Sequence, residues 1–366
     1  MTMIIDGTLG TTFPDSTLQP AAASPYVLKN KIINGDMRID QRNAGASVTP
    51  TNGQYTLDRY RAILTQASKF SVQQNAGSVT PPAGFNYYLG VTSLSAYSIV
   101  AGDLFQINHF IEGYNVADLA WGTANAKTVT LSFWVRSSLT GTFGGALMNS
   151  AGDRSYPYTY TISAANTWEQ KTITITGDTS GTWLTTNGIG ISVTFGLGAG
   201  STYSGTAGSW QAAGYYTATG ATSVVGTNGA TFYITGVQLE VGSTATPFER
   251  RLYNQELANC QRYYWKWIPT TAYNMIGSGY CSSTTVAYAT VTNPATMRSA
   301  PTLTSGGNFR VCSATCQTVT SISIASGGTL TSFVQANVAS GLVTGNGAAL
   351  GDNNDTTAYI GFSSEL

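Results

Sequence analysis

The sequence predicts an all-β protein with a jelly-roll β-sandwich, one short connecting helix and a smaller C-terminal antiparallel β domain. Only 9% of the 366 residues are charged, whereas 41 are Gly and 21 are Tyr. Aromatic and β-branched residues favour pleated strands, and Gly favours tight turns. Apolar and polar residues also alternate along most of the chain, which is typical of half-buried strands. A helical period rich in charges occurs in one stretch, residues 249–267.

Residues 1–27 are expected to form a separate N-terminal segment. In it, "IIDGTLGTTF" fits a small hairpin, and "LQPAAASP" reads as a linker. A segment this short cannot bury a core, so we expect it to dock on another copy or on another protein. It lacks the basic and apolar regions of a signal peptide, and the chain has no run of about 18 apolar residues. We therefore expect synthesis in a cytoplasm without export, and no membrane insertion.

Residues 28–248 are expected to form one large β domain. In "KTVTLSFWVRSS", Val129, Leu131, Phe133 and Val135 alternate with polar neighbours and so point to one side of a strand. Further segments repeat this alternation between Gly, Asn or Asp residues: "YPYTYTI", "WEQKTITIT", "GIGISVTFGLG" and "ATFYITGVQLE". Many strands separated by turns indicate a sandwich or barrel, and about 220 residues suit a jelly roll with long loops.

Residues 249–267 predict the connecting helix. Tyr253, Leu257, Cys260 and Tyr264 fall on one helical face, and the charged residues are expected on a solvated face. Two interpretations of the apolar face stay open: packing on the helix's own domain, or a seam between copies in an oligomer.

Residues 268–366 predict the smaller β domain. "TVAYATVTNP", "TSISIAS" and "TTAYIGFSS" alternate, with turns such as "SGGN" and "GDNND" between strands. A β domain of this size with so few charges would tend to associate through its exposed surface, so we expect an oligomer.

The charge balance excludes some partners. Lys plus Arg and Asp plus Glu each total 17, so the formal net charge is zero. Because no basic excess exists to neutralise phosphates, neither nucleic acid nor an anionic membrane surface is expected as a partner. A neutral, Tyr-rich surface fits neutral polar partners such as sugars, and equally fits a protein kept soluble by hydroxyl groups or by assembly.

The residues offer no catalytic or metal motif. The single histidine, His109, lies in a strand-like segment, and no Gly-x-Ser-x-Gly motif occurs, so we expect no histidine-based catalysis and no cofactor. A pair of carboxylates for glycoside hydrolysis stays open, because such a pair meets only in the fold. Cys312 and Cys316 lack a nearby histidine, so a zinc site is not expected and all four cysteines are predicted to be buried thiols. Carboxylates in the large domain follow no motif and are expected in turns or on the surface: Asp103, Glu112, Asp118, Asp153, Glu169 and Asp178.

Aromatic residues in Gly/Thr-rich segments are the candidates for glycan contacts. An aromatic face stacks on the apolar face of a sugar, and nearby amides and hydroxyls pair with its hydroxyl groups. For any single ring, core packing or a subunit contact is the alternative. The candidates are Trp183, Trp210, Tyr215, Tyr216, Tyr87 and Tyr88.

Several motifs together resemble a known class of protein. They are "LKNKIINGDMRIDQRNAGASV", "YTLDRY", "VTLSFWVRSS", "FYITGVQLEVG" and "TPFERRLYNQELANCQRYYWK". In this order they resemble phage virion structural proteins of the tail-fibre or receptor-binding type, which carry a jelly-roll domain similar to carbohydrate-binding modules. The segment "GTLGTTFPDSTLQ" is similar to an N-terminal segment of tail-fibre proteins. The resemblance covers roughly residues 1–267.

The resemblance implies a non-enzymatic phage fibre protein. Residues 1–27 would attach it to other virion proteins, and a distal C-terminal domain would contact host cell-surface polysaccharide, with a homotrimer as the expected assembly. The protein would be made in the host cytoplasm and located in the virion, most simply in the tail. Two alternatives stay open: a head fibre or capsid decoration protein, and a polysaccharide depolymerase.

The resemblance leaves metal binding undecided. Carbohydrate-binding jelly rolls often place an acidic calcium ligand just before the final strand, where this chain has Ile234-Thr235-Gly236. Asp36 remains, but calcium requires several oxygen ligands.

Overall fold

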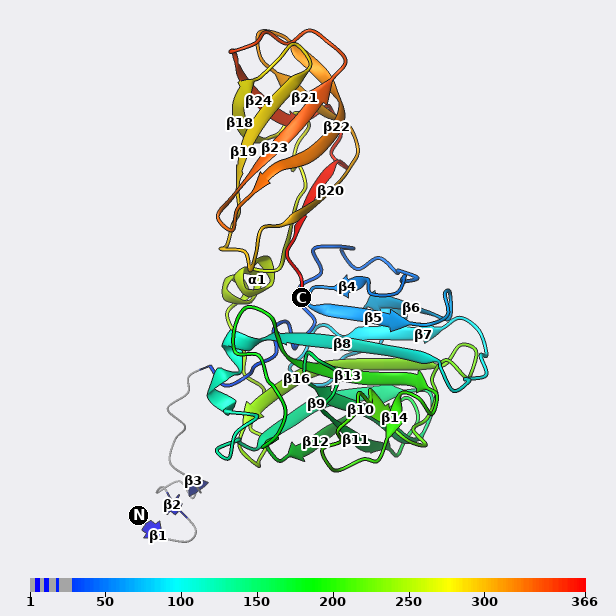
Figure 1. The fold of residues 1–366 in the computed structure, drawn as a ribbon. Helices are drawn as coiled ribbons and strands as arrows, with labels where there is room; N and C mark the ends of the chain where they lie inside the picture. The colour runs from blue at the N-terminus through cyan, green and yellow to red at the C-terminus, as the bar shows by residue number, and fades with distance from the viewer. Residues whose placement is uncertain (1–3, 7–9, 13–17, 20–27) are drawn as a thin grey trace.

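The computed structural model describes residues 4–6, 10–12, 18–19 and 28–366. Within them the chain is almost entirely β, so the predicted all-β class is confirmed. Figure 1 shows a β-sandwich, the helix α1 (Tyr253–Gln261) at its edge, and a β-barrel beyond the helix. Among the described residues, no helix is long and apolar enough to cross a membrane.

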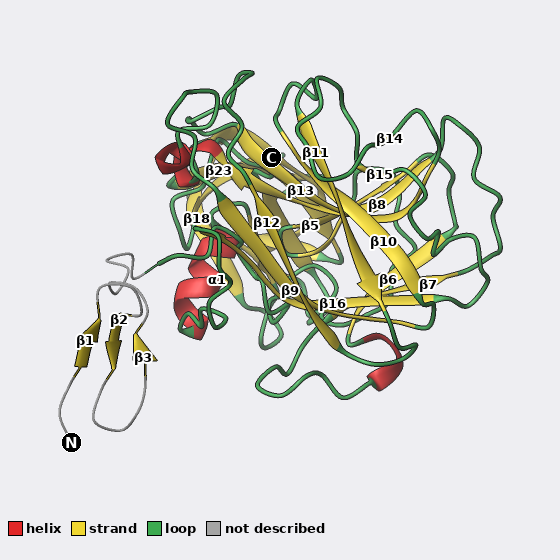
Figure 2. Cartoon of the chain, turned by 90° about the horizontal axis from the view of Figure 1, so that it is seen from below, coloured by secondary structure: helices red, strands yellow, loops and turns green. Residues whose placement is uncertain are grey.

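The sandwich consists of two antiparallel sheets around one core (Figure 2). Consecutive strands from β7 to β10 alternate between the sheets, as in a jelly roll. The six-stranded sheet has the order β11 (Ser155–Ile162), β10 (Gly141–Met148), β13 (Ile189–Ala199), β8 (Leu104–Glu112), β5 (Tyr60–Leu64), β4 (Tyr55–Leu57). The five-stranded sheet has the order β12 (Glu169–Ile175), β9 (Val129–Ser137), β16 (Thr231–Val241), β7 (Leu89–Ser93), β6 (Phe70–Gln74). The loops hold β14 (Ser204–Gly205), β15 (Thr217–Ala218), η1 (Ala76–Ser78), η2 (Gly113–Asn115) and η3 (Ala117–Leu119).

Side-chain alternation explains how the sheets pack. On β9, Val129, Leu131, Phe133 and Val135 are fully buried, which confirms the face predicted for them. Apolar residues at every second position of the facing strands fill the same core.

The N-terminal segment contains the predicted hairpin. β1 (Ile4–Asp6) pairs antiparallel with β2 (Gly10–Thr12), and β3 (Leu18–Gln19) pairs with β2 in turn. The rest of the predicted linker, residues 20–25, lies outside the described residues.

The connecting helix is shorter than the predicted 249–267. After α1, residues Tyr264–Trp267 form strand β17, which pairs with β25 (Tyr359–Ser363). This pairing stacks Trp265 on Phe362, with ring centroids 4.5 Å apart. The tertiary contact outweighs the local helical period, because helix propensity is a weak preference.

The predicted apolar stripe is therefore not one helical face. Tyr253 is 55% exposed, Leu257 is half-buried, and Tyr264 lies in β17. The buried residues of α1 are Glu256 and Cys260. Association of copies through this region stays a prediction.

Glu256, the charged residue within α1, is buried, so the prediction of a solvated charged face on this helix is wrong. Arg251 lies 2.9 Å from Glu249 and 3.1 Å from Glu256. The two carboxylates also accept hydrogen bonds from the backbone. Glu249 accepts one from the N–H of Asn30 at 2.9 Å, and Glu256 accepts one from the N–H of Asn34. These contacts hold the chain before the sandwich against the helix.

A second group of charges joins the sandwich to the residues after it. Glu365 pairs with Arg42 at 2.8 Å and with Arg59, and Glu112 pairs with Arg262 at 2.6 Å. The charge-rich stretch of the sequence thus belongs to a buried junction between the sandwich and the barrel domain.

The barrel domain contains a closed six-stranded barrel and a small sheet. Small inward residues such as Ala287, Ala289 and Ala336 are buried, which suits a narrow interior. The barrel order is β18 (Met275–Cys281), β19 (Val286–Thr292), β23 (Thr331–Val338), β22 (Cys316–Gly327), β21 (Phe309–Cys312), β24 (Gly347–Asp352). The small sheet has the order β17, β25, β20 (Thr302–Gly306).

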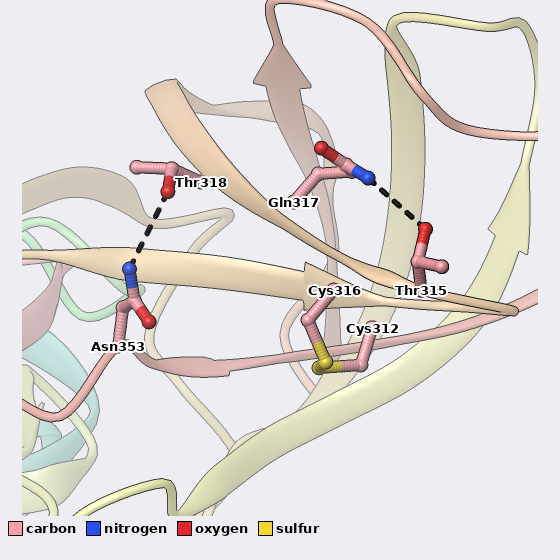
Figure 3. Close-up of a disulfide and its surroundings, with 6 residues drawn as sticks. All are labelled: Cys312, Thr315, Cys316, Gln317, Thr318 and Asn353. Atoms are coloured by element: carbon pink, nitrogen blue, oxygen red, sulfur yellow. Dashed lines mark hydrogen bonds between the residues drawn. A yellow bond between two sulfur atoms is a disulfide. The ribbon is translucent and has the colours of Figure 1, made fainter.

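Two of the four cysteines form a disulfide, contrary to the prediction of thiols. The antiparallel register of β21 and β22 places Cys312 opposite Cys316, and the two are bonded (Figure 3). Cys260 and Cys281 are buried thiols, as predicted. The disulfide closes the turn between the two strands.

Candidate functional site

A groove on the outer face of the six-stranded sheet is the candidate site. Its volume is about 240 Å³. Strands β5, β8 and β13, the end of β10 with the loop after it, and the segment before β15 supply its walls. The groove is lined by Arg61, Ile63, Leu104, Gln106, Asn108, Phe110, Met148, Asn149, Ser150, Ala151, Gly152, Ile189, Ser192 and Tyr216.

The floor of the groove is polar because of the alternation along β8. Phe105 and Ile107 belong to the sandwich core, so Gln106 and Asn108 point the other way, into the groove. Ser192 on the neighbouring β13 joins them. These three polar side chains are 0%, 3% and 2% exposed, respectively.

Four atoms of this floor have no hydrogen-bond partner within the described part of the chain. They are both amide atoms of Gln106, Oδ1 of Asn108 and Oγ of Ser192. Buried polar atoms in native proteins nearly always have partners, and one left unpaired costs roughly 1–3 kcal/mol. The floor offers acceptors, a donor and a hydroxyl group that can do both. A ligand with several hydroxyl groups matches this set.

Two glycines allow a loop to form one wall. A Cβ on Gly144 or Gly196 would lie 2.5 Å or 2.8 Å from Oγ1 of Thr217, so glycine is needed for the segment around β15 to rest on the sheet. Thr194 Oγ1 lies 2.7 Å from the carbonyl oxygen of Tyr216 and donates a hydrogen bond to it. This bond holds the Tyr216 backbone against the sheet, and Tyr216 lines the groove.

The opposite wall combines a cation with an aromatic ring. The Arg61 guanidinium carbon lies 5.4 Å from the Phe110 ring centroid, and Arg61 Nε donates to the Gly53 carbonyl at 3.0 Å. None of the residues that line the groove is an Asp, Glu or His. The groove itself therefore has binding groups but no carboxylate or imidazole for acid–base chemistry.

Two predicted glycan contacts belong to a packed aromatic cluster instead. The ring centroids of Trp183 and Trp210 lie 5.4 Å apart, and both rings pack edge-to-face against Trp121. Trp183 is 8% exposed, so it offers no face to a sugar, and the prediction is wrong for this residue. Trp210 is half-buried and donates its indole N–H to the Thr176 carbonyl at 2.8 Å.

The four predicted tyrosines lie in different environments. Tyr216 lines the groove. Tyr88 is fully buried and donates its hydroxyl to the Ala76 carbonyl at 2.5 Å, so the prediction of a glycan contact is wrong there. Tyr87 is 37% exposed and Tyr215 is half-buried, and neither lines the groove. Their role in binding stays a prediction.

Trp210→Ala is expected to lower the free energy of unfolding by about 2 kcal/mol, because it removes a half-buried ring with three aromatic neighbours. The groove and any ligand binding in it are expected to stay unchanged, since Trp210 lies outside the groove. Urea denaturation and retention on immobilised polysaccharide measure the two effects. Weaker binding at unchanged stability would instead make Trp210 a ligand contact.

The carboxylates of the large domain each have a structural partner. Each of the six predicted carboxylates thus forms a local hydrogen bond or ion pair. The pairs are Asp103 with Tyr97, Glu112 with Arg262, Asp118 with Lys31, Asp153 with Asn149, Glu169 with Lys171 and Asp178 with Arg154.

His109 has a structural position. It is 1% exposed, and its Nε2 lies 3.0 Å from the Ile33 carbonyl oxygen. Burial and the nearby Arg59 hold the pKa of His109 well below its usual value, so the imidazole is neutral. It lies on the core side of β8, away from the groove.

Asp36, the remaining candidate calcium ligand, forms an ion pair. Its carboxylate lies 2.8 Å from Arg38 Nε. In the described part of the chain, no group of three or more His, Cys, Asp or Glu side chains is placed to hold a metal ion.

The sequence pattern does not predict the three polar residues of the groove floor, Gln106, Asn108 and Ser192. In "LFQINHFIE" two of them look like ordinary outward-facing polar residues of a strand. Their burial depends on the loop segments that the fold brings over the sheet. A useful signal is the pair of amides at alternate positions of a strand whose other face is strongly apolar.

Known proteins provide distant likenesses. No protein-family model matches the chain, and no curated protein matches it. Among solved structures, the enzymatically active domain of tailspike protein 4 of bacteriophage CBA120 is 12% identical, with a TM-score of 0.32 over 60% of this chain and 22% of that chain. A protein from Bacteroides thetaiotaomicron that is described as sugar-binding is 11% identical, with a TM-score of 0.33 over 58% of this chain and 100% of that chain. A family 11 carbohydrate-binding module of a Clostridium thermocellum cellulase is 12% identical (TM-score 0.27; 56% and 100%). These likenesses are distant, so the functional argument depends on the groove itself.

Proposed function

We propose that this chain is a non-enzymatic phage virion fibre protein, a tail fibre or receptor-binding protein, that adheres to host surface glycans through the groove. The observation that carries the binding proposal is the buried polar floor with four unpaired atoms. Sugars combine many hydroxyl groups with apolar ring faces, and Tyr216 and Phe110 supply apolar surface beside the floor. The phage assignment depends on the sequence motifs of residues 1–267.

The proposed mechanism is multivalent adhesion without bond cleavage. The residues that line the groove include no carboxylate or imidazole, which supports binding rather than hydrolysis. Shallow sites bind single glycans weakly, but a trimer present in several copies per virion multiplies them through effective concentration. Residues 1–27 would attach the fibre to other virion proteins.

Asn108→Leu together with Gln106→Met is expected to weaken retention on a neutral polysaccharide at least about tenfold, because both amides are replaced by apolar groups of similar size. The free energy of unfolding is expected to stay equal or to rise, since unpaired buried polar atoms disappear. Affinity chromatography on immobilised dextran, xylan, mannan and galactan, and on polysaccharide from host cells, measures retention. Urea denaturation measures stability.

A matched control is Gln170→Ala on β12 in the other sheet, where the side chain is exposed. It is expected to change neither quantity. Retention of the wild type on none of these polysaccharides overturns the proposal, and so does equal retention of the wild type and the double variant. Release of reducing ends during incubation would show that the chain is an enzyme.

A further inference from the structure

We propose a second carbohydrate-binding site on the outer wall of the barrel, formed by Tyr280, Tyr288 and Phe333. We refer to these three rings as the aromatic platform. The site extends the adhesive function proposed above and rests on it, but it shares no residue with the groove and lies in the other domain. The sequence pattern does not single it out, because each ring occurs in a different strand.

The strand register assembles the platform. Tyr280 on β18 lies directly opposite Tyr288 on β19, and β19 pairs in turn with β23, which carries Phe333 diagonally across from Tyr288. The alternate residues of β19 and β23, such as Ala289 and Val334, fill the barrel core, so the three rings project outward. The three strands lie side by side in the barrel wall (Figure 1).

The three rings form one contiguous aromatic cluster. The rings of Tyr288 and Phe333 are stacked, with an interplanar angle of 10° and centroids 4.9 Å apart, and the Tyr280 ring lies 5.8 Å from Tyr288 at an angle of 45°. Tyr280 is 46% exposed, and the other two rings are half-buried. The Tyr280 ring and the uncovered side of the stacked Tyr288–Phe333 pair offer apolar surface to the ring face of a sugar.

The surroundings favour a neutral hydroxylated partner. Strands β18, β19, β22 and β23 contain no charged residue, so an acidic polysaccharide or a nucleic acid would meet no opposite charge on this wall. Beside the rings, Gln335 Nε2 donates to Asn337 Oδ1 at 3.0 Å, and Asn337 Nδ2 donates to Ser321 Oγ at 2.8 Å. This oriented amide row can still accept and donate hydrogen bonds at its free positions. Rings flanked by fixed amides suit a neutral glycan.

The test compares four forms of the full chain on the immobilised neutral polysaccharides: the wild type, Tyr280→Ala/Tyr288→Ala, Tyr280→Phe/Tyr288→Phe, and the groove variant Gln106→Met/Asn108→Leu. The double alanine variant is expected to lose about tenfold in affinity, because two stacking faces are removed. The double phenylalanine variant keeps both faces and is expected to retain most of the affinity. Circular dichroism and light scattering report folding and particle mass for each form.

Each outcome separates the two sites. Unchanged affinity of the double alanine variant overturns the platform, and if the groove variant loses affinity at the same time, the proposed function still stands. Loss in the platform variant alone supports the platform and contradicts the groove. A smaller particle mass for the double alanine variant would show that the platform is a contact between copies, which also overturns the proposal. If the double alanine variant does not fold, the affinities of the double phenylalanine variant and of Phe333→Leu are compared with that of the wild type. Wild-type affinity of the double phenylalanine variant together with weaker binding by Phe333→Leu supports the platform. Unchanged affinity of Phe333→Leu overturns it.

Discussion

Glu365→Gln is expected to lower the free energy of unfolding by about 3–5 kcal/mol, the usual cost of removing one partner from a buried ion pair. The partner is Arg59, whose side chain is 1% exposed, and the Glu365 side chain is 7% exposed. Burial alone would lower the pKa of Arg59, but the Glu365 carboxylate, together with Tyr263, Tyr55 and Cys260, raises the pKa above the ordinary value. Without that carboxylate, a buried guanidinium loses the charge that compensates it.

Arg59 is also unable to move to solvent when its partner is lost. Its Nη2 donates to the Phe110 carbonyl at 2.6 Å, and its guanidinium carbon lies 3.6 Å from the Tyr263 ring centroid. These contacts come from β8 and from the chain next to α1, so Arg59 is held from two sides. The desolvation cost cannot be relieved by a simple side-chain rotation.

A control pair and a rescue make this prediction specific. Asp118 forms a more exposed ion pair with Lys31, and its side chain is 33% exposed. Asp118→Asn removes this carboxylate and is expected to lower the free energy of unfolding by less than about 1 kcal/mol. Adding Arg59→Met to Glu365→Gln is expected to recover part of the loss, because the unpaired charge is removed as well. Urea denaturation measures all four forms. Equal costs for Glu365→Gln and Asp118→Asn would contradict a buried, stabilising junction.

The junction shows where sequence patterns stop being informative. The density of charge near α1 is visible in the sequence, and the helical period of residues 253–261 is real. A local pattern, however, gives no information on partners that are distant in the chain, such as Glu112 for Arg262 or Glu365 for Arg59. Charges on a short helix usually face solvent, but here Glu256 of α1 is buried against Arg251 and the backbone N–H of Asn34.

The strands were predictable because they depend on a two-residue period, and the sites were not because they depend on register. The alternation of β9 is sufficient to identify its core face. By contrast, Gln106 becomes part of a buried floor only when the segment around β15 lies over the sheet, and Tyr280 meets Tyr288 only through the pairing of β18 with β19. Trp183 shows the reverse case, since a Gly/Thr-rich context suggested exposure while neighbouring tryptophans bury it.

The free energy of unfolding is expected to contain a contribution from Asp58 that disappears as the pH rises from about 4 to about 7. Burial raises the pKa of the Asp58 carboxyl from 3.8 to about 7, against the opposing effects of Arg42 and of hydrogen bonds from Gln41. In the unfolded chain the carboxyl loses its proton near 3.8, whereas in the folded chain it keeps the proton up to about 7. Between these values the folded state binds more protons, so its stability falls with increasing pH. At about 1.4 kcal/mol per pH unit, the loss amounts to about 4 kcal/mol.

Asp58→Asn removes this titration and is therefore expected to be as stable as the wild type near pH 4 and more stable by about 4 kcal/mol near pH 8. The difference between the two curves isolates Asp58 from other titrating groups. Asp103→Asn provides a control of opposite sign. Burial raises the pKa of Asp103, but hydrogen bonds from Val100, Tyr97 and Thr65 lower it by more, so the pKa lies below its usual value. Its ionised form stabilises the fold, so this variant is expected to be less stable than the wild type at neutral pH and to approach it in acid. Urea denaturation from pH 4 to pH 8 gives the curves. Parallel curves for the wild type and Asp58→Asn would mean that Asp58 is ionised in the folded protein, with Arg42 and Gln41 fully offsetting its burial.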